Sequence, residues 1–519
     1  MSLIPFADRL RSLTGGRRLA VAIGAGAASV LALPPLFVLP VLLLTIPLWL
    51  TLLDGAERRR SAFWISWGFG FGYFAAGLYW IAHALLMDAA RFGWMVPFAI
   101  GGLSAVLAVY IGLTGLSVHV LRLRGAARVF AVAGAWTLME ILRGILLTGF
   151  PWNPLGSVWA AVPPVLQLAS LTGVFGLSLL TVLVAASPVC GRKGVAVAAA
   201  GLSAVALLGW LRLPSGPSPV VDGVRLRLVQ PNIPQTLKWD ASAREDNLRQ
   251  YLALSQLPAL DRPPTHILWG ETAVPYALDG QNDGMLRQII AAPLAVHQPG
   301  NPQAGVIVGA IRATPAGQEP FRIWNSMVAL DPSGTVTGTY DKAHLVPFGE
   351  YVPYKSVLPL PKVTVGATDY SAGPGPATVS LPGLPPVGPL ICYEVIFPGA
   401  VADPVNRPQW LLNPTNDGWY GYSTGPFQHL DTAVLRAVEE GLPVVRVANT
   451  GVSAVIDAYG RTTARIGLEV AGYTDADLPQ AVAPTLFSRI GVWSSVALGF
   501  LSLLVGLLLQ RKCVRPDAG

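Results

Sequence analysis

The sequence has few charged residues. Of its 519 residues, 13% are Asp, Glu, Lys or Arg and 52% are hydrophobic. A soluble protein carries about a quarter charged residues, so the composition excludes a wholly water-soluble chain and indicates extensive contact with lipid. The net charge is +7, but the basic residues form short clusters between apolar runs. This pattern is typical of membrane topology and does not indicate a nucleic-acid partner.

Cysteine is also scarce, and its spacing excludes two kinds of site. Cys190, Cys392 and Cys513 lie far apart, and no CxxC pair occurs. Neither a zinc site nor a disulfide framework is therefore indicated. Internal repeats and low-complexity tracts are absent as well. We expect no metal and no cofactor.

Long apolar runs fill the first two-fifths of the chain. About 20 apolar residues in a helix cross the hydrocarbon core of a bilayer. The first two runs are short and meet at Pro34-Pro35, which predicts a tight helical hairpin. An eighth apolar run closes the chain. The predicted spans are 19–34, 36–53, 62–86, 94–120, 128–148, 165–188, 194–212 and 490–510.

Between the seventh and eighth runs the sequence changes character. Strand-like segments, turn pairs and most acidic residues appear there, after a Pro/Ser linker at 214–219. We expect a membrane domain at 1–213 with seven helices, a mixed α/β domain at 214–488, and a final span with its tail at 489–519. Within the α/β domain, the predicted strands include 224–230, 266–269, 305–311 and 387–391, and the predicted helices are 242–256 and 426–440.

The basic clusters indicate the orientation of the spans. With eight spans, the clusters at 9–18, 58–60, 122–128, 192–193 and 511–515 all fall on one side. The positive-inside rule makes that side cytoplasmic, so the α/β domain is expected to be periplasmic in a bacterium. A cleaved signal peptide ending near GAGAAS is the alternative for the first run.

Three polar residues stand where strand-like segments end. They are Glu271 in HILWGETAVP, Lys342 in TYDKAHLVPFGEYVP and Cys392 in GPLICYEVIFP. Each has an ordinary explanation by itself: a solvated loop carboxylate, a loop lysine and a buried small apolar residue. Together they suffice for acyl transfer, because a carboxylate can deprotonate the thiol and an ammonium can stabilise the thiolate and the oxyanion.

The strings around these residues resemble the nitrilase superfamily, and with the membrane spans they resemble the apolipoprotein N-acyltransferase family. The matching strings are QPNIPQTLKW, WGETAVP, YDKAHLVPFGEYVP, ICYE, NPTNDGWYG, GPFQHL and ANTGVSAVID. They cover the α/β domain from end to end. The resemblance implies an α-β-β-α sandwich beside a bundle of about eight transmembrane helices. One departure is Thr415, where the family favours Ser.

The resemblance also implies residue roles and substrates. Glu271 would be the general base, Lys342 the cation that stabilises the oxyanion, and Cys392 the nucleophile. Supporting or substrate-binding positions would be Trp239, Glu350, Tyr393 and Glu394. A buried Glu394 would need a partner, and we expect Lys342 to be that partner.

By the same resemblance, a phospholipid such as phosphatidylethanolamine would acylate Cys392. The α-amine of the diacylglyceryl-cysteine of an apolipoprotein would then take the chain in the inner membrane.

Other functions and mechanisms stay open at the level of sequence. A Cys–His pair would need His344 or His429 beside Cys392. A membrane-anchored amidase of the nitrilase type would use the same three residues to hydrolyse a small C–N substrate. A binding or scaffold protein on this fold would be expected to have lost them.

Overall fold

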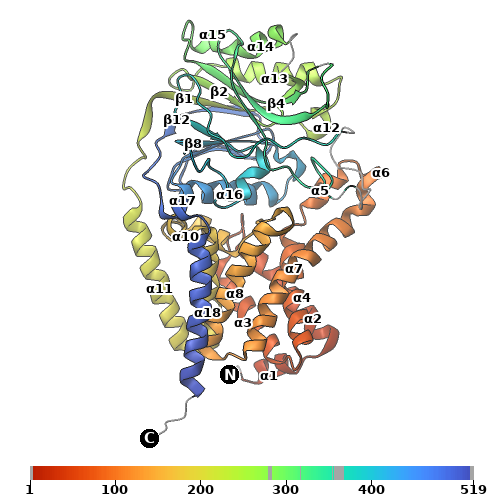
Figure 1. The fold of residues 1–519 in the computed structure, drawn as a ribbon, viewed down its shortest axis with the longest axis vertical. Coiled ribbons are helices and arrows are strands. Elements are labelled where there is room, and N and C mark those ends of the chain that lie inside the picture. The colour runs from red at the N-terminus through yellow and green to blue at the C-terminus, as the bar shows by residue number, and fades with distance from the viewer. Residues whose placement is uncertain (1–3, 279–282, 316, 354, 356–367, 515–519) are drawn as a thin grey trace. The chain divides into compact units, whose positions relative to one another are not determined.

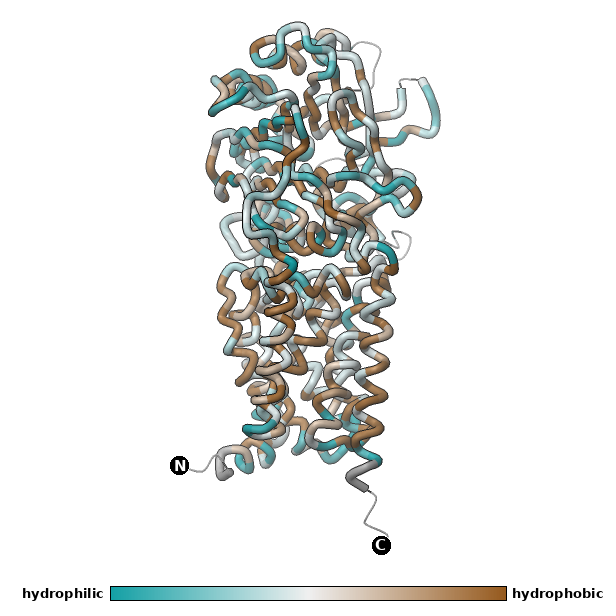
Figure 2. The backbone as a smooth tube through the Cα atoms, turned by 90° about the vertical axis from the view of Figure 1, so that its left-hand side faces the viewer, coloured by the Kyte–Doolittle hydropathy of each residue, from teal (hydrophilic) through white to brown (hydrophobic). Residues whose placement is uncertain are grey.

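The computed structural model describes residues 4–278, 283–315, 317–353, 355 and 368–514. They form two compact units. Unit 1 comprises Met1–Ala82, Asp88–Leu213 and Thr485–Gly519, and unit 2 comprises His83–Met87 and Pro214–Pro484. Figure 1 shows that the described part of unit 1 is helical and that unit 2 contains the strands. Figure 2 shows the higher hydropathy of the unit 1 helices.

Each predicted apolar run is largely helical in unit 1. Among the described residues, four helical stretches are long and apolar enough to cross a membrane: Ala89–Leu121, Gly125–Thr148, Ala169–Arg212 and Trp493–Arg511. A shorter apolar helix covers Leu39–Asp54. The longer helices of unit 1 are α2 Gly15–Ser29, α3 Leu42–Asp54, α4 Arg59–Gly77, α7 Val96–Leu121, α8 Gly125–Ile145, α10 Ala169–Ala186, α11 Gly191–Arg212 and α18 Trp493–Val514; short ones are α1 Ile4–Ser12, α6 Ala89–Phe92, α9 Pro163–Leu166 and α17 Leu486–Ile490.

Two predicted runs are not single straight helices. The run 62–86 is interrupted, because α4 ends at Gly77 and α5 begins only at Ile81 and runs to Leu86. The run 165–188 changes direction at Gly173, whose φ of +65° is accessible to glycine at little cost. Hydropathy alone does not reveal these breaks, since the residues on both sides are equally apolar.

Glycine lets two helices of unit 1 approach closely. A Cβ atom on Gly26 of α2 would lie 1.8 Å from the Phe69 carbonyl oxygen of α4, and one on Gly72 would lie 1.9 Å from the Ile23 carbonyl oxygen. Apolar helices gain little from excluding lipid, so close backbone packing at small residues is what holds such pairs together.

Unit 2 is built on two sheets. The first has the order β12-β1-β2-β4-β5-β6, with β3 beside β4, and the second has the order β11-β10-β9-β8-β7. The strands of the first sheet are β1 Val220–Gln230, β2 His266–Trp269, β3 Val274–Ala277, β4 Gly305–Ala313, β5 Ile323–Leu330, β6 Val336–Asp341 and β12 Gly472–Pro479. Those of the second are β7 Val387–Pro389, β8 Trp410–Thr415, β9 Val444–Ala448, β10 Ser453–Ile456 and β11 Thr462–Ile466.

The two sheets share an apolar core, and helices cover their outer faces. Leu228 and Leu268 of the first sheet belong to the same buried cluster as Leu412 and Val445 of the second. Apolar residues of α13 Arg244–Gln256 and of the neighbouring α14 Gly284–Ala291 and α15 Pro293–His297 pack on the other face of the first sheet. The helix α16 Gly425–Glu440 lies against the second sheet (Figure 1). The result is an α-β-β-α sandwich.

The sequence located these elements closely, with one difference near Cys392. Strand β2 and helices α13 and α16 match the predicted ranges to within two residues. The predicted strand 387–391 ends at Pro389, because the chain turns out of the sheet and Cys392 adopts a φ of +51°. A positive φ ends regular strand pairing.

Candidate active site

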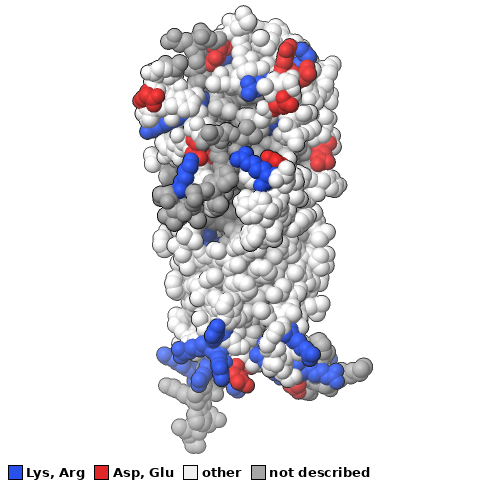
Figure 3. Space-filling view, turned by 90° about the vertical axis from the view of Figure 1, so that its right-hand side faces the viewer, with Lys and Arg blue, Asp and Glu red and all other residues white. Residues whose placement is uncertain are grey.

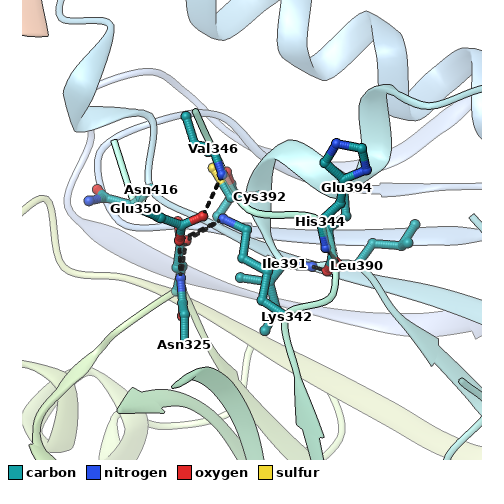
Figure 4. Close-up of polar contacts among 12 residues, drawn as sticks. Asn325, Lys342, His344, Val346, Glu350, Leu390, Ile391, Cys392, Glu394 and Asn416 are labelled. Atoms are coloured by element: carbon teal, nitrogen blue, oxygen red, sulfur yellow. Dashed lines mark hydrogen bonds and ion pairs between the residues drawn. The ribbon is translucent and has the colours of Figure 1, made fainter. Parts of the chain in front are cut away.

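The ends of three strands bring the predicted residues together. Glu271 lies two residues after β2 and Lys342 directly follows β6, both in the first sheet. Cys392 lies three residues after β7 in the second sheet. Their exposed fractions are only 7%, 1% and 5%. Figure 4 shows Lys342, Glu350 and Asn325 grouped beside Cys392.

One ammonium and two carboxylates meet around an amide. Lys342 Nζ donates to Glu350 Oε1 at 3.0 Å and lies 3.5 Å from Glu271 Oε1. Asn325 Nδ2 donates to the same two oxygens, at 3.0 Å from Glu350 and 2.7 Å from Glu271. Glu350 Oε2 also accepts from the Val346 amide at 2.8 Å. Glu350 is therefore a structural member of the cluster.

Burial and charge set the protonation of the lysine and the thiol. Burial alone lowers the pKa of Lys342, but the carboxylates of Glu350 and Glu271 outweigh it and hold this pKa above its usual range. Burial and the charge of Glu271 raise the pKa of the Cys392 thiol to about 12, against the opposing effects of Lys342 and of a hydrogen bond from Thr415. The free thiol is consequently protonated at neutral pH, and a base must take its proton as it attacks.

Two side chains donate hydrogen bonds to the backbone of Cys392. Its carbonyl oxygen accepts from Asn413 Nδ2 at 3.3 Å and from His429 Nε2 at 3.1 Å. A non-glycine residue at a φ of +51° is sterically strained, so these contacts stabilise an unfavourable conformation. The strained turn fixes the direction in which the thiol leaves the sheet.

A buried charged network supports His429. His429 Nδ1 lies 2.9 Å from Asp417 Oδ1 and 3.1 Å from Arg446 Nη2, which also donates to Asp417 Oδ2 at 2.6 Å. Burial and the charge of Arg446 lower the pKa of His429. The Cys392 carbonyl oxygen can only accept, so its contact with Nε2 requires a proton on that nitrogen. Arg446 outweighs burial at Asp417 and lowers its pKa to about 2.

Glu394 does not use Lys342 as its hydrogen-bond partner, contrary to the sequence-based expectation. Its Oε1 accepts from Tyr340 Oη at 2.9 Å and from the amides of Ala343 and His344 at 2.8 and 3.0 Å. Its Oε2 accepts from the Ile391 amide at 2.7 Å. Backbone amides thus replace a cation, although burial still raises the pKa of Glu394 to about 6. The carboxylate ties the segment after β6 to the turn before Cys392.

The remaining predicted residues lie at the border of this cluster. Tyr393 is buried, and its ring packs edge-on against His344 and Phe397 at centroid distances of 5.7 and 5.2 Å. The His344 ring stacks on Phe397 at 3.8 Å, and Figure 4 places it apart from the Cys392 sulfur. Trp239 is half-buried and follows the short helix α12 Gln235–Lys238.

Sequence reasoning missed two buried residues of this site. Asn325 lies in β5, where it is a polar residue in an otherwise largely apolar strand, IWNSMVAL. Lys238 precedes Trp239, and its Nζ donates to the backbone oxygen of Glu271 at 2.7 Å. Its place inside QPNIPQTLKW, one of the resembling strings, was the available signal. Among the described residues no group of three or more His, Cys, Asp or Glu side chains is arranged to hold a metal ion.

Two protein families match the two units. Residues 25–187 match the apolipoprotein N-acyltransferase N-terminal domain, and residues 225–485 match the carbon-nitrogen hydrolases. Among solved structures, the chain matches Saccharomyces cerevisiae Nit3, a member of branch 10 of the nitrilase superfamily. That comparison gives 17% identity and a TM-score of 0.36, covering 51% of this chain and 93% of Nit3.

Full-length relatives carry one common name. The chain is 41% identical to the apolipoprotein N-acyltransferase of Rhodopseudomonas palustris over 96% of both proteins. It is 39% identical to that of Caulobacter vibrioides over 93% of both. At this identity over nearly the whole length, the chain belongs to the apolipoprotein N-acyltransferase family.

Proposed function

We propose that the chain transfers an acyl chain from a membrane phospholipid to the N-terminal amine of diacylglyceryl-cysteine on apolipoproteins, through a thioester on Cys392. The observation that carries this proposal is the buried grouping of Glu271, Lys342 and Cys392 at the ends of strands from both sheets. The likeness to full-length apolipoprotein N-acyltransferases supports the choice of acceptor.

The first half-reaction acylates the enzyme. The Cys392 sulfur attacks the ester carbonyl of the phospholipid while Glu271 takes the thiol proton. Negative charge develops on the carbonyl oxygen, and Lys342 stabilises it. The tetrahedral intermediate then expels the glycerol oxygen, which takes the proton from Glu271. A thioester and a lysophospholipid result.

The second half-reaction returns the free thiol. The α-amine of the acceptor attacks the thioester carbonyl and loses a proton to Glu271. When the C–S bond breaks, the thiolate takes that proton and the acyl chain remains on nitrogen as an amide. Two products leave in two separate stages, so ping-pong kinetics are expected.

The contacts of the supporting residues indicate the roles that we propose for them. Glu350 accepts from Lys342 Nζ and thereby orients the ammonium toward the reacting carbonyl. Glu394 fixes the two backbone segments that carry Lys342 and Cys392. Tyr393 shapes the buried side of the nucleophile turn, and Trp239 at the half-buried border contacts the acyl chain.

The membrane arrangement belongs to the same proposal. Residues 1–213 cross the bacterial inner membrane seven times and 489–519 contain the eighth span, so the catalytic residues 214–488 are periplasmic. Both substrates are anchored in the membrane, and a domain attached to it at both ends meets them at the bilayer surface. The proposed donor is phosphatidylethanolamine, which supplies its sn-1 chain.

The thioester gives the decisive test. Purified protein incubated with phosphatidylethanolamine alone should gain the mass of one acyl group, and hydroxylamine should remove it. Cys392→Ala should gain nothing, while Cys190 and Cys513 stay unmodified. Adding a diacylated lipopeptide should discharge the adduct and yield a triacylated product.

A steady release of free fatty acid without a trappable adduct would favour the amidase-type hydrolase instead. That enzyme would need no lipid acceptor, and its activity would not depend on the lipopeptide. Transfer to the lipopeptide by Cys392→Ala would rule out the thioester altogether.

A further inference from the structure

A second lysine is buried beside the general base. Lys238 ends the helix α12 and has an exposed fraction of 5%. A buried ammonium costs several kcal/mol unless it is paired or hydrogen-bonded. Its hydrogen bond among the described residues goes to the backbone oxygen of Glu271 at 2.7 Å. The side chain thus contacts the proposed general base through its backbone.

The turn that carries Glu271 is held from two sides. On one side Gly309 of β4 donates its amide to the Gly270 oxygen at 3.2 Å. A Cβ atom on Gly309 would lie 2.5 Å from the Thr272 amide nitrogen, so only glycine leaves room for this turn. Thr272 adopts a φ of +45°, which is strained for a β-branched residue. Lys238 provides the second attachment, at the carbonyl between Gly270 and Thr272.

The charges of the site also need a second cation. Glu271 and Glu350 share the amide of Asn325 and one ammonium, that of Lys342. Two carboxylates against one ammonium leave an excess negative charge in a buried site, where uncompensated charge is costly. The ammonium of Lys238 offsets this excess.

We propose that Lys238 is a positioning residue for Glu271: it fixes the turn that carries the base through the backbone oxygen, and its charge offsets the excess negative charge of the two carboxylates. The inference rests on the proposed function, in which Glu271 is the general base.

The charge of Lys238 is itself sensitive to pH. Burial lowers its pKa to about 8, against the opposing attraction of the neighbouring Glu271 carboxylate. The Glu271 carboxylate in turn lies 3.5 Å from Lys342 Nζ and shares the Asn325 amide with Glu350. As pH rises through 8, the neutral amine can still donate to the Glu271 oxygen, but the charge is lost. Thioester formation should therefore slow above pH 8.

The experiment measures single-turnover thioester formation on phosphatidylethanolamine by intact mass, from pH 6 to pH 9.5. Lys238→Met should slow it by about tenfold to a hundredfold, which is the range for a misplaced catalytic group. Lys238→Arg should retain the neutral-pH rate within about threefold and lose the decline above pH 8, because a guanidinium stays charged. Lys355→Met is the matched control, since Lys355 is exposed and ion-paired with Asp369.

The outcomes separate this inference from the proposed function. A wild-type protein that forms no thioester on Cys392 refutes the proposed function. A wild-type protein that does, with Lys238→Met matching its rate and pH profile, overturns only the role of Lys238. A thermal melt shows whether Lys238→Met folds. If it does not fold, the pH dependence of thioester formation by Lys238→Arg tests the proposal instead. A rate that declines above pH 8 as in the wild type contradicts the proposal.

Discussion

At the scale of single residues, Asn325 allows the carboxylates of Glu271 and Glu350 to lie close together in a buried site. Its amide nitrogen donates to Glu271 and Glu350 from 2.7 and 3.0 Å, and its exposed fraction is 4%. Like charges at such separations repel strongly in a buried site, and hydrogen bonds to the charged forms are what offset the repulsion. A donor at this position is therefore as necessary as the cation of Lys342.

Asn325→Asp replaces that donor with a third carboxyl group and should couple stability to pH. One carboxyl of the crowded set must bind a proton, so its pKa in the folded protein rises above its unfolded value. Stability is then retained at low pH and lost as pH rises through the raised pKa, by about 1.4 kcal/mol for each unit of pKa shift. Thermal melts at pH 5 and pH 8 should show a larger deficit relative to wild type at pH 8.

The control for this variant is Asn301→Asp, in the turn before β4, where the side chain accepts from the Gln303 amide at 3.0 Å. Its deficit should not grow between pH 5 and pH 8. An Asn325→Asp protein whose melting temperature follows wild type at both pH values would contradict the crowding of carboxylates.

At the scale of elements, the turn between β7 and the short 3₁₀ helix Cys392–Ile396 fixes the direction of the nucleophile's side chain. Helix α16 contributes His429 and strand β8 contributes Asn413, and both donate to the Cys392 carbonyl oxygen. The alternative of a Cys–His pair is thus replaced by a contact of His429 with the backbone of the cysteine. The conformation of the Cys392 backbone consequently depends on how α16 packs on the second sheet.

His429→Phe should slow thioester formation by about tenfold or more, because the strained turn loses one of its two side-chain donors and the sulfur is misplaced. The matched control is His266→Phe. His266 is also buried, and its Nε2 lies 3.0 Å from the backbone carbonyl oxygen of Pro382. It is the first residue of β2, the strand that ends two residues before Glu271. Both variants should lose about 1–3 kcal/mol of unfolding free energy, and only His429→Phe should lose acylation rate. Equal rates in the two variants would remove His429 from the positioning of Cys392.

At the scale of the whole molecule, the basic residues gather at helix ends of unit 1. Arg58 precedes α4, Arg122 and Arg124 lie between α7 and α8, and Arg192 is the second residue of α11. On the face seen in Figure 3, Lys and Arg side chains collect at one end of unit 1, and a band of uncharged surface adjoins them. Such an asymmetry favours retention of this end in the cytoplasm.

A fusion experiment tests the orientation that follows. A reporter active only in the periplasm should work when fused near Pro217 and fail when fused after Arg192. A cytoplasmic reporter should give the opposite pattern at the same two positions. Periplasmic activity at Arg192 would reverse the proposed eight-span layout.

The sequence by itself determined the α/β class, the positions of most elements and the three residues of chemical interest. It did so because short stretches of sequence are enough to recognise these features. Apolar runs of sufficient length predict spans, the residues of a strand predict that strand, and polar residues that follow a strand mark its end. Glu271, Lys342 and Cys392 are found this way since the end of a strand fixes where the next side chain lies.

Only the tertiary structure decided which residues support them. Asn325 and Glu271 are 54 positions apart, and Lys238 and Glu271 are 33 apart, so no local pattern pairs them. The partners of Glu394 are largely backbone amides, which every residue other than proline has, so the residue types do not show which amides will be used. The breaks at Gly77 and Gly173 and the left-handed turn at Cys392 likewise depend on packing. An unpaired buried charge destabilises the folded protein, so each buried charged group needs a partner. Which residue becomes that partner depends on the tertiary fold, because the two are far apart in the sequence.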